Sequence, residues 1–326
     1  MSAAPKLPVS VLLPTRNSMT MLRPHLDAAH DWLPLVQEVV VVDSASTDGT
    51  AEFLRENLQH PSVRLLQHPP GLYESWNFGI TRCAAEFIYI STVGDSITPA
   101  GLRRLVEVGE QFQCDVIISA PEIIDAAGQV TRLNWPVTQL QQALAQGRDV
   151  VLEPEWTWLF AVASMRKAIL GSSASNLYRR NVLQARLFPT DYGHAGDVGW
   201  GLKYAPDVRL GVLAETVSTF VLHPRAKKVV ADGWSRRLET SRQTLARVRE
   251  RVSPETLALA ESLCEAWAAW AEAQQQVQAA RKKSPLAVLT PEFWRWRAAK
   301  ARAEQTLAEL QDEAWRRIAA QARVIR

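Results

Sequence analysis

The sequence predicts an α/β protein in which helices flank a mostly parallel sheet and a helical extension follows. In the first 120 residues, short apolar runs rich in β-branched residues alternate with amphipathic segments. Such strands are typical of a sheet that helices cover on both faces. Beyond residue 228 the composition changes to Ala, Arg, Glu, Gln and Trp, with few strand formers. At 326 residues the chain can hold one large domain and a smaller appendage, and we expect residues 1–228 and 229–326 to form them.

Five strands and four helices are expected in the front part of the chain. The strands are Val9–Leu13, Glu38–Val42, Val63–Leu66, Phe87–Ser91 and Asp115–Ser119. The helices between them are Thr20–Leu33, Thr50–Leu58, Glu74–Cys83 and Pro99–Phe112. Because crossovers between parallel strands are right-handed, the carboxyl ends of the strands meet at one edge, where open α/β sheets bind ligands. Functional residues are therefore expected directly after each strand.

The pattern loosens between about residues 120 and 178. There Leu133–Trp135, Trp156 and Trp158 suggest strands or loops laid over the sheet, and Gln139–Ala145 suggests a short helix. A final α/β stretch follows. It is expected to contain a helix at Asp197–Tyr204 and strands at Arg209–Leu213 and Val217–Leu222.

Three helices are expected near residues 234–252, 254–283 and 291–323, with a turn at Lys282–Pro285. The second and third each begin with a capping residue, a proline and an early acid, at Ser253 and Thr290. Half of the 12 tryptophans lie in this extension. Three alternatives follow: burial of Trp and Ala inside the protein, self-association, or a basic, Trp-rich face on a membrane surface. The last rests on one sequence feature, the cations around two tryptophans: Lys282, Lys283, Arg295 and Arg297 flank Trp294 and Trp296.

Bulk properties exclude several classes of protein. The formal charge of +3 is too weak to indicate a nucleic-acid partner. The three cysteines Cys83, Cys114 and Cys264 form no CxxC pair, which predicts neither a zinc site nor a disulfide framework and fits a reducing compartment. The first residues do not read as a signal peptide, and the apolar run Trp158–Met165 is too short for a membrane span. We expect a cytoplasmic protein, at most peripheral at the inner face of a membrane.

Polar clusters follow the expected strands at Leu13–Asn17, Val42–Thr50 and Ile90–Ser96, and another lies at Gly71–Ile80. Asp43 ends a strand, where a carboxylate can accept hydrogen bonds from a nucleobase or a ribose hydroxyl. Asp48 and Thr50 are expected to cap the next helix. The carboxylate at Asp95 could hold a divalent cation bridging two phosphates, because Mg²⁺ and Mn²⁺ favour oxygen ligands. Taken alone, one aspartate in a loop is more often a turn residue or a cap than a metal ligand.

Together these clusters resemble a known family. The blocks VSVLLPTRN, VVVDSASTDGT, GLYESWNFGI and FIYISTVGD resemble, in order and spacing, the donor half of family 2 glycosyltransferases with the GT-A fold. The third and fourth resemble the bacterial polysaccharide-synthesis branch, whose members read like GIYDAMNKGI and FLNSGD. The resemblance covers about residues 8–225 and is strongest up to residue 105.

The resemblance implies residue roles in the donor half. Pro14, Thr15 and Asn17 would frame the nucleotide, Asp43 would read the base, and Asn77 and Gly79 would pack beneath the donor. Asp95 matches the metal ligand of the family's DxD region, which implies Mn²⁺ or Mg²⁺ as cofactor. Thr92 and Gly94, however, stand where the commoner form has its two acids, so metal dependence stays open.

The resemblance extends more weakly into the second half. Asp197 matches an aspartate that starts a helix facing the acceptor and acts as the general base of an inverting transferase. An N-cap is the alternative role. His223 matches a family position that touches the metal or the diphosphate, and Arg225 suits phosphate oxygens. The alternative there is a strand-end histidine beside a solvated basic loop. Surface or capping positions are expected for the other histidines, namely His25, His30, His60, His68 and His194.

The function implied is a hexosyltransferase-like enzyme of polysaccharide biosynthesis. It would move a sugar from a nucleoside diphosphate, UDP before GDP, to a hydroxyl of a glycan or lipid-linked acceptor, with inversion. One alternative is a catalytically inactive partner subunit or scaffold that binds nucleotide sugars. A sugar nucleotidyltransferase would need a Gly-rich, basic phosphate loop, which Leu13–Asn17 lacks. In a third alternative the helical extension carries the main function, and the front domain is only an anchor. Homo-oligomerisation through the C-terminal helices is a separate partner expectation.

Overall fold

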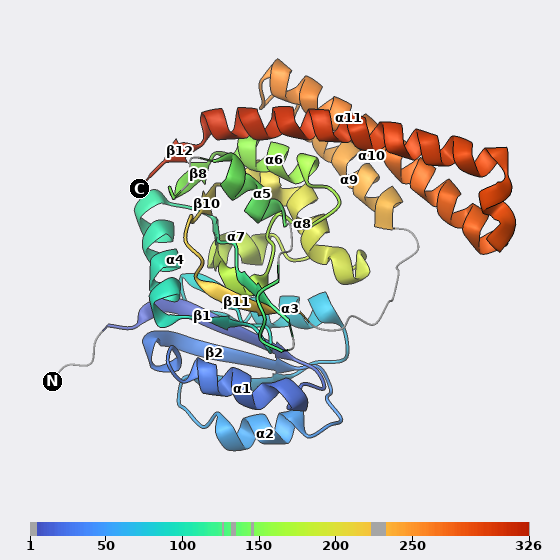
Figure 1. Cartoon of the computed structure of the whole chain (residues 1–326). Helices are drawn as coiled ribbons and strands as arrows, with labels where there is room; N and C mark the ends of the chain where they lie inside the picture. Colours follow the sequence, from blue (N-terminus) through green and yellow to red (C-terminus); the bar gives the residue numbers. More distant parts are fainter. Residues whose placement is uncertain (1–4, 126, 132–134, 145–146, 223–232, 326) are drawn as a thin grey trace.

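The computed structural model describes residues 5–125, 127–131, 135–144, 147–222 and 233–325. A nine-stranded sheet has the order β12-β8-β10-β6-β9-β4-β1-β2-β3, and a three-stranded sheet has the order β5-β11-β7 (Figure 1). The strands of the large sheet are β1 Leu7–Thr15, β2 Val36–Asp43, β3 Val63–Gln67, β4 Phe87–Ile90, β6 Val116–Ile118, β8 Val150–Leu152, β9 Asn176–Arg179, β10 Leu210–Val212 and β12 Arg323–Val324. Those of the small sheet are β5 Ser96–Ile97, β7 Glu122–Ile124 and β11 Ser218–Val221.

The helices lie where the amphipathic segments predict them, with a few additions. In the front part they are α1 Met19–Ala29, α2 Thr50–Asn57, α3 Leu72–Ile80 and α4 Pro99–Phe112. The middle part has α5 Pro136–Ala143, α6 Pro154–Ala163, α7 Arg180–Ala185 and α8 Gly196–Tyr204. The extension has α9 Gly233–Val248, α10 Pro254–Lys283 and α11 Pro291–Gln321. The α/β class and the three C-terminal helices are thus confirmed.

The strand directions bring the predicted clusters to one edge of the sheet. β1 pairs in parallel with β2 and β4, and β2 pairs in parallel with β3. β9 runs antiparallel to both β4 and β6, so β6 again runs with β4, and β10 is parallel to β6. Thr15 and Asp43 are register partners at the ends of β1 and β2. The residues that follow these strands therefore share the carboxyl edge, as expected for an α/β ligand site.

The expectation for Trp156 and Trp158 is wrong, because both lie in helix α6 rather than in strands or loops. All residues of α6 from Thr157 to Ala163 are buried, and the helix packs against α8, α10 and α11. A helix that is buried on every side shows no amphipathic period, so its sequence cannot be told from that of a buried strand. Trp135 immediately precedes α5, while Leu133 and Asn134 lie outside the described residues.

The helical extension shares one hydrophobic core with the front part. Val40 of β2, Trp158 of α6, Trp267 of α10 and Leu307 of α11 belong to the same buried cluster. The indole Nε1 of Trp267 donates to Val162 O at 3.1 Å. β12, at the end of the chain, adds an antiparallel edge strand to β8. A boundary at residues 228 and 229 stays a prediction, since both lie outside the described part.

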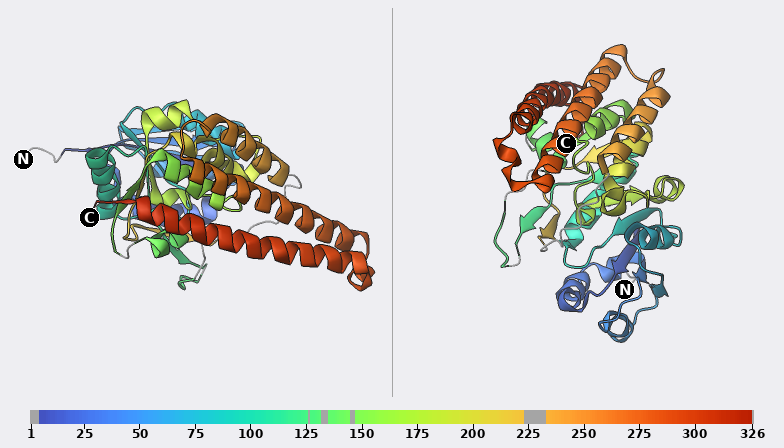
Figure 2. Two further views of the ribbon diagram at one scale, coloured as in Figure 1. Left: turned by 90° about the horizontal axis from the view of Figure 1, so that it is seen from above. Right: turned by 90° about the vertical axis from the view of Figure 1, so that its right-hand side faces the viewer.

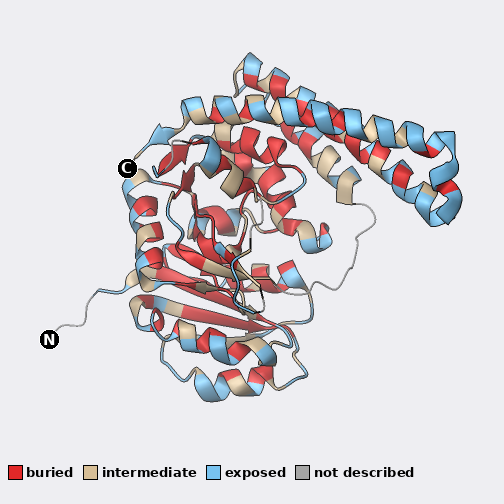
Figure 3. Ribbon diagram, in the orientation of Figure 1, coloured by how far each residue is buried: buried red, intermediate tan, exposed pale blue. Residues whose placement is uncertain are grey.

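The two long helices α10 and α11 form a hairpin that runs out beyond the rest of the molecule (Figures 1 and 2). Both begin as predicted: Ser253 Oγ accepts from Thr256 N at 3.2 Å, and Thr290 Oγ1 accepts from Phe293 N at 3.3 Å. Buried residues concentrate on the sheet and α6, and exposed ones on the outer faces of the hairpin (Figure 3). Among the helices described, none is long and apolar enough to cross a bilayer.

We predict that Gly79→Ala destabilises the protein through the packing of α3 on the sheet. An added Cβ would lie 2.3 Å from Leu12 Cδ1 and 3.0 Å from Val42 Cγ2. Overpacking of this kind lowers the free energy of unfolding by about 2 kcal/mol. Urea unfolding measures it. Gly233→Ala is the control, because nothing lies within 4 Å of a Cβ there; equal stability of the two variants would contradict the prediction.

Candidate active site

Asp43 sits at the carboxyl edge of the sheet and is only 1% exposed. Its Oδ1 accepts from Thr15 Oγ1 at 3.2 Å and from Ser46 Oγ at 2.5 Å, and its Oδ2 accepts from Ser46 N at 3.0 Å. A carboxylate offers about four acceptor sites. Asp43 therefore shapes the turn after β2 and keeps about one acceptor site for a ligand.

The loops after β1 and β2 are joined by side-chain hydrogen bonds. Asn17, which has a positive φ of 47°, accepts from Thr47 N through its Oδ1 at 2.8 Å and donates its backbone N–H to Ser46 Oγ at 2.9 Å. Asp48 accepts from Met19 N at 3.0 Å and from Thr50 N at 3.1 Å, and so bonds the first N–H of both α1 and α2. The N-cap of α2 is Gly49 and its first residue is Thr50, so neither Asp48 nor Thr50 occupies the predicted capping position. The predicted donor residues Thr15, Asn17 and Asp43 thus lie together, with Pro14 one residue before them in β1.

Asp95 follows β4 and is 4% exposed. Its Oδ2 accepts from Thr92 Oγ1 at 2.6 Å and from Ser172 Oγ at 3.4 Å, and its Oδ1 accepts from Val221 N at 3.1 Å. The loop after β4 is thereby tied to β11, the strand that leads toward residue 223. His223 and Arg225 lie outside the described residues.

No group of three or more His, Cys, Asp and Glu side chains that could hold a metal occurs among the residues described. Thr92, at a position where the commoner DxD form has an acid, donates a hydrogen bond to Asp95 instead of adding a carboxylate. Mg²⁺ commonly binds through one or two protein carboxylates, with phosphates and water supplying the other oxygens. The residues at Asp95 fit such a cation only if the ligand's phosphates supply most of the coordination.

His25 is buried, 5% exposed, so its expected surface or capping position is wrong. Its Nδ1 lies 3.0 Å from Asp95 O and its Nε2 lies 3.2 Å from Ser91 Oγ. Burial lowers the pKa of His25 to about 4, against the opposing effect of the hydrogen bond to Asp95. A neutral ring can donate from Nδ1 to the carbonyl and accept the Ser91 hydroxyl at Nε2. The sequence contains a signal for this burial, because His25 falls on the same buried face of α1 as Leu22 and Leu26.

Asn77 connects the donor half to the second half of the fold. Its Nδ2 donates to Phe188 O at 2.8 Å, and its Oδ1 accepts from Phe188 N at 3.0 Å. The ring of Phe188 stacks on Tyr73, with ring centroids 5.4 Å apart and planes at 25°. Gly79, two residues further along α3, lets this helix approach the sheet closely. Asn77 and Gly79 therefore position α3, with both ends of the Asn77 amide bonded to protein.

Asp197 lies in the first turn of α8, one residue after Gly196, where the helix begins. It is not the N-cap; that position belongs to Ala195. Its Oδ1 accepts from Val198 N at 2.8 Å, and its own N–H donates to Tyr73 Oη at 3.1 Å. Burial raises the pKa of Asp197, while the Val198 N–H, the Tyr73 hydroxyl and the charge of Arg237 oppose this rise. A carboxylate with a raised pKa is suited to act as a general base.

Two neighbours of Asp197 had no role in the sequence-based prediction. Tyr73 is 4% exposed, and a Cβ at Gly196 would lie 2.5 Å from its ring, so the glycine there makes room for Tyr73. Arg237 comes from α9; its Nη1 donates to Met165 O at 3.2 Å and to Arg166 O at 3.1 Å. Its position 40 residues after Asp197 in sequence gives no signal, because only the packing of α9 on α8 brings the two together.

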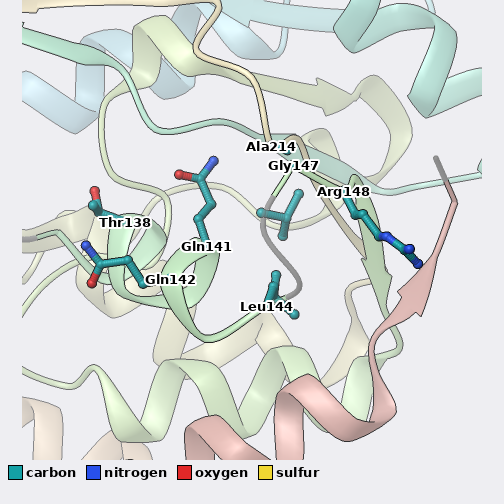
Figure 4. A pocket seen from close by; sticks show the side chains of 8 residues that line it. Thr138, Gln141, Gln142, Leu144, Gly147, Arg148 and Ala214 are labelled. Carbon is teal, nitrogen blue, oxygen red and sulfur yellow. The ribbon is translucent and has the colours of Figure 1, made fainter.

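A surface pocket lies beside the carboxyl end of β10, four strands along the sheet from β1 (Figure 4). Thr138, Gln141, Leu144, Arg148 and Ala214 are among the residues that line it. It contains none of the residues predicted for the site. Gln141 Nε2 donates to Leu213 O at 2.5 Å, which ties α5 to the segment after β10.

We predict that Asn77→Asp loosens the connection between the two halves. The carboxylate would lose the donor to Phe188 O and place negative charge against that carbonyl, at a cost of about 2 kcal/mol. Thermal unfolding at neutral pH measures the loss. Asn57→Asp is the matched control, because Asn57 makes the same kind of bond, Nδ2 to Phe53 O at 2.8 Å, on the exposed surface. An equal drop in the unfolding temperature of both variants would argue against a special role of Asn77.

The comparisons with known proteins agree with this geometry. Residues 10–171 match the family model described as Glycosyl transferase family 2. No curated protein sequence matches the chain. Residues 1–349 of TarS from S. aureus superpose with a TM-score of 0.55 at 15% identity, covering 96% of this chain and 90% of that one.

Two further solved structures contain donors. TarS 1–349 in complex with UDP-GlcNAc has a TM-score of 0.53 at 15% identity, with 94% of this chain and 91% of that chain covered. The mannosyltransferase PcManGT from Pyrobaculum calidifontis, in complex with GDP-Man and Mn²⁺, has a TM-score of 0.52 at 21% identity, with 97% and 88% covered. Similarity at these identities shows the fold alone. The fold is GT-A-like, and residues 10–171 belong to glycosyltransferase family 2.

Proposed function

We propose that this enzyme transfers a sugar, with inversion, from a nucleoside diphosphate to a hydroxyl of a glycan or lipid-linked acceptor, as in cytoplasmic polysaccharide biosynthesis. The placement of Asp197 carries the proposal. This carboxylate has a raised pKa and lies next to Tyr73 of α3, the helix that packs on β1 and β2. A base so placed can take the proton of the acceptor hydroxyl while that oxygen attacks the sugar opposite the leaving group.

The donor would occupy the edge formed by the loops after β1 and β2. Pro14, Thr15, Asn17 and Asp43 would frame the base and ribose, with Arg225 nearer the diphosphate. TarS in complex with UDP and UDP-GlcNAc supports UDP as the first choice, and PcManGT in complex with GDP-Man supports GDP as the second. One scaffold serves many sugars, so the donor must be identified by binding.

Asp95, together with His223, would hold Mn²⁺ or Mg²⁺. When bound, the cation supplies positive charge that offsets the charge on the departing diphosphate. The carboxylate of Asp95 is held in place for this by Thr92 and Val221. Because Thr92 is not an acid, a partner subunit that binds nucleotide sugar without transferring it is the second candidate function.

We predict that one nucleoside diphosphate, or its sugar, stabilises the protein against thermal unfolding. A ligand at 100 times its dissociation constant adds about 2.7 kcal/mol. Asp43→Asn should weaken this stabilisation with or without metal, and Asp95→Ala should remove only the part that Mn²⁺ or Mg²⁺ adds. Asp31→Ala, an exposed aspartate outside these loops, is the control. If no nucleotide stabilises the protein under any condition, the proposed donor site is wrong.

We predict that Tyr73→Phe moves the acid limb of the pH profile of kcat/KM to higher pH. The base must be unprotonated, and the Tyr73 hydroxyl lowers the pKa of Asp197, so its removal raises the pKa and protonates the base at higher pH. Asp197→Asn should reduce transfer by about 10² to 10⁴ while donor binding persists.

Tyr204→Phe, on the same helix but packed against Trp200, is the control and should leave the limb in place. An unmoved limb in Tyr73→Phe would count against the coupling to Asp197. Near wild-type transfer by Asp197→Asn would refute the base assignment. Tight donor binding by the wild type without transfer, with any metal, would favour the partner-subunit function.

A further inference from the structure

The outer end of the α10–α11 hairpin exposes a compact apolar surface. We call residues 281–297 the hairpin tip. Seven large apolar side chains are exposed in the described part of the chain, and four of them lie between residues 286 and 294. They are Leu286 (68% exposed), Val288 (39%), Leu289 (74%) and Trp294 (56%). Apolar side chains gathered in this way are typical of an interaction surface rather than of scattered surface residues.

The hairpin tip is also the part of the hairpin that reaches farthest from the body. α10 and α11 extend past the other elements in Figure 1 and in the left view of Figure 2, and the two views are at right angles. The exposed colouring of the tip in Figure 3 agrees with this position. A protruding tip can touch a flat surface without a collision of the rest of the molecule.

A small apolar cluster and local hydrogen bonds order the hairpin tip. Val277, Ala287 and Phe293 form a small buried cluster beneath it. Ser284 Oγ accepts from Leu286 N at 3.1 Å, and Thr290 Oγ1 donates to Ala287 O at 2.8 Å. These bonds hold the turn in one shape, so little conformational freedom would be lost on binding.

Trp294 has the arrangement needed to enter an apolar medium. Its indole Nε1 donates to Val288 O at 2.7 Å, while the residue as a whole is 56% exposed. An unpaired N–H would be costly to remove from water, but this one already has a partner. Arg297 lies over the ring at 5.4 Å, which places a cation next to the apolar side chain.

The positive charge of the hairpin tip indicates which kind of partner it binds. It carries five exposed cations and one acid: Arg281, Lys282, Lys283, Arg295 and Arg297 against Glu292. A second copy of this chain would present the same cations, and like charges brought together oppose association. A bilayer of anionic phospholipids offers both the opposite charge and an apolar interior.

We propose that the hairpin tip is a peripheral membrane anchor, which inserts Leu286, Leu289 and Trp294 into the interface of an anionic bilayer. Its cations then lie at the level of the lipid phosphates. The anchor goes beyond sugar transfer and does not depend on it, because lipid binding requires neither donor nor Asp197. It would bring the enzyme to an acceptor that is itself lipid-linked.

Flotation of the full chain with vesicles tests the anchor. The chain should bind vesicles of mixed phosphatidylcholine and phosphatidylglycerol, bind pure phosphatidylcholine vesicles far less, and dissociate as salt rises. Leu286→Ser/Leu289→Ser should weaken binding about tenfold or more for each leucine. Lys282→Gln/Lys283→Gln should weaken it about fivefold for each cation.

Matched control variants make the same kinds of substitution at exposed residues outside the hairpin tip. Val130→Ser alters an apolar side chain that is 66% exposed, and Arg23→Gln/Arg55→Gln removes two cations from α1 and α2. Both controls should bind vesicles like the wild type. Thermal unfolding verifies that each variant is folded, and Leu289→Ser alone replaces the double variant if that one unfolds early.

Three results would overturn the proposal. The first is equal binding to both kinds of vesicle, and the second is undiminished binding of the tip variants. The third is a change of oligomeric state in sedimentation velocity when Leu286 and Leu289 are replaced, with vesicle binding unchanged. That last result would identify the hairpin tip as a contact between copies of the chain.

Discussion

The site depends on the position of helix α3, which contacts three parts of the fold at once. Gly79 lets it lie directly on Leu12 and Val42 of the sheet. Asn77 holds the backbone of Phe188, and Tyr73 reaches the N–H of Asp197 at the start of α8. A shift of this one helix would move the base relative to the donor edge. Because packed interiors leave little room for adjustment, each of these contacts constrains the others.

The three aspartates of the site differ in what surrounds them, and so in what they can do. Asp43 and Asp95 each accept at least three hydrogen bonds from neighbouring protein groups, which shape the loops after β2 and β4. Asp197 lies where burial raises its pKa. The first two are therefore suited to hold a ligand or cation as fixed acceptors, and the third to exchange a proton.

The C-terminal helices pack against the front part of the chain and share its hydrophobic core. They cover α6, they contribute Arg237 beside Asp197, and β12 extends the sheet at β8. The outer end of the α10–α11 hairpin extends beyond the body (Figure 1). Buried tryptophan and alanine lie where the hairpin packs on the body, and exposed leucine, tryptophan and cations lie at its tip. One pair of helices thus serves the core at one end and offers a surface at the other.

The sequence by itself determined seven of the twelve strands in the described part of the chain, most helices, the helix starts at Ser253 and Thr290, and the clusters after β1, β2 and β4. Each of these depends on residues close together in the chain, where periodicity, capping and strand ends leave a local signal. The tertiary structure decided the rest. Helix α6 lost its amphipathic signal because it is buried on all sides, and Asn77 meets Phe188 across 111 residues. Tyr73 and Arg237 reach Asp197 only through the packing of α3 and α9 on α8, since contacts between distant segments arise from how helices and sheet fit together.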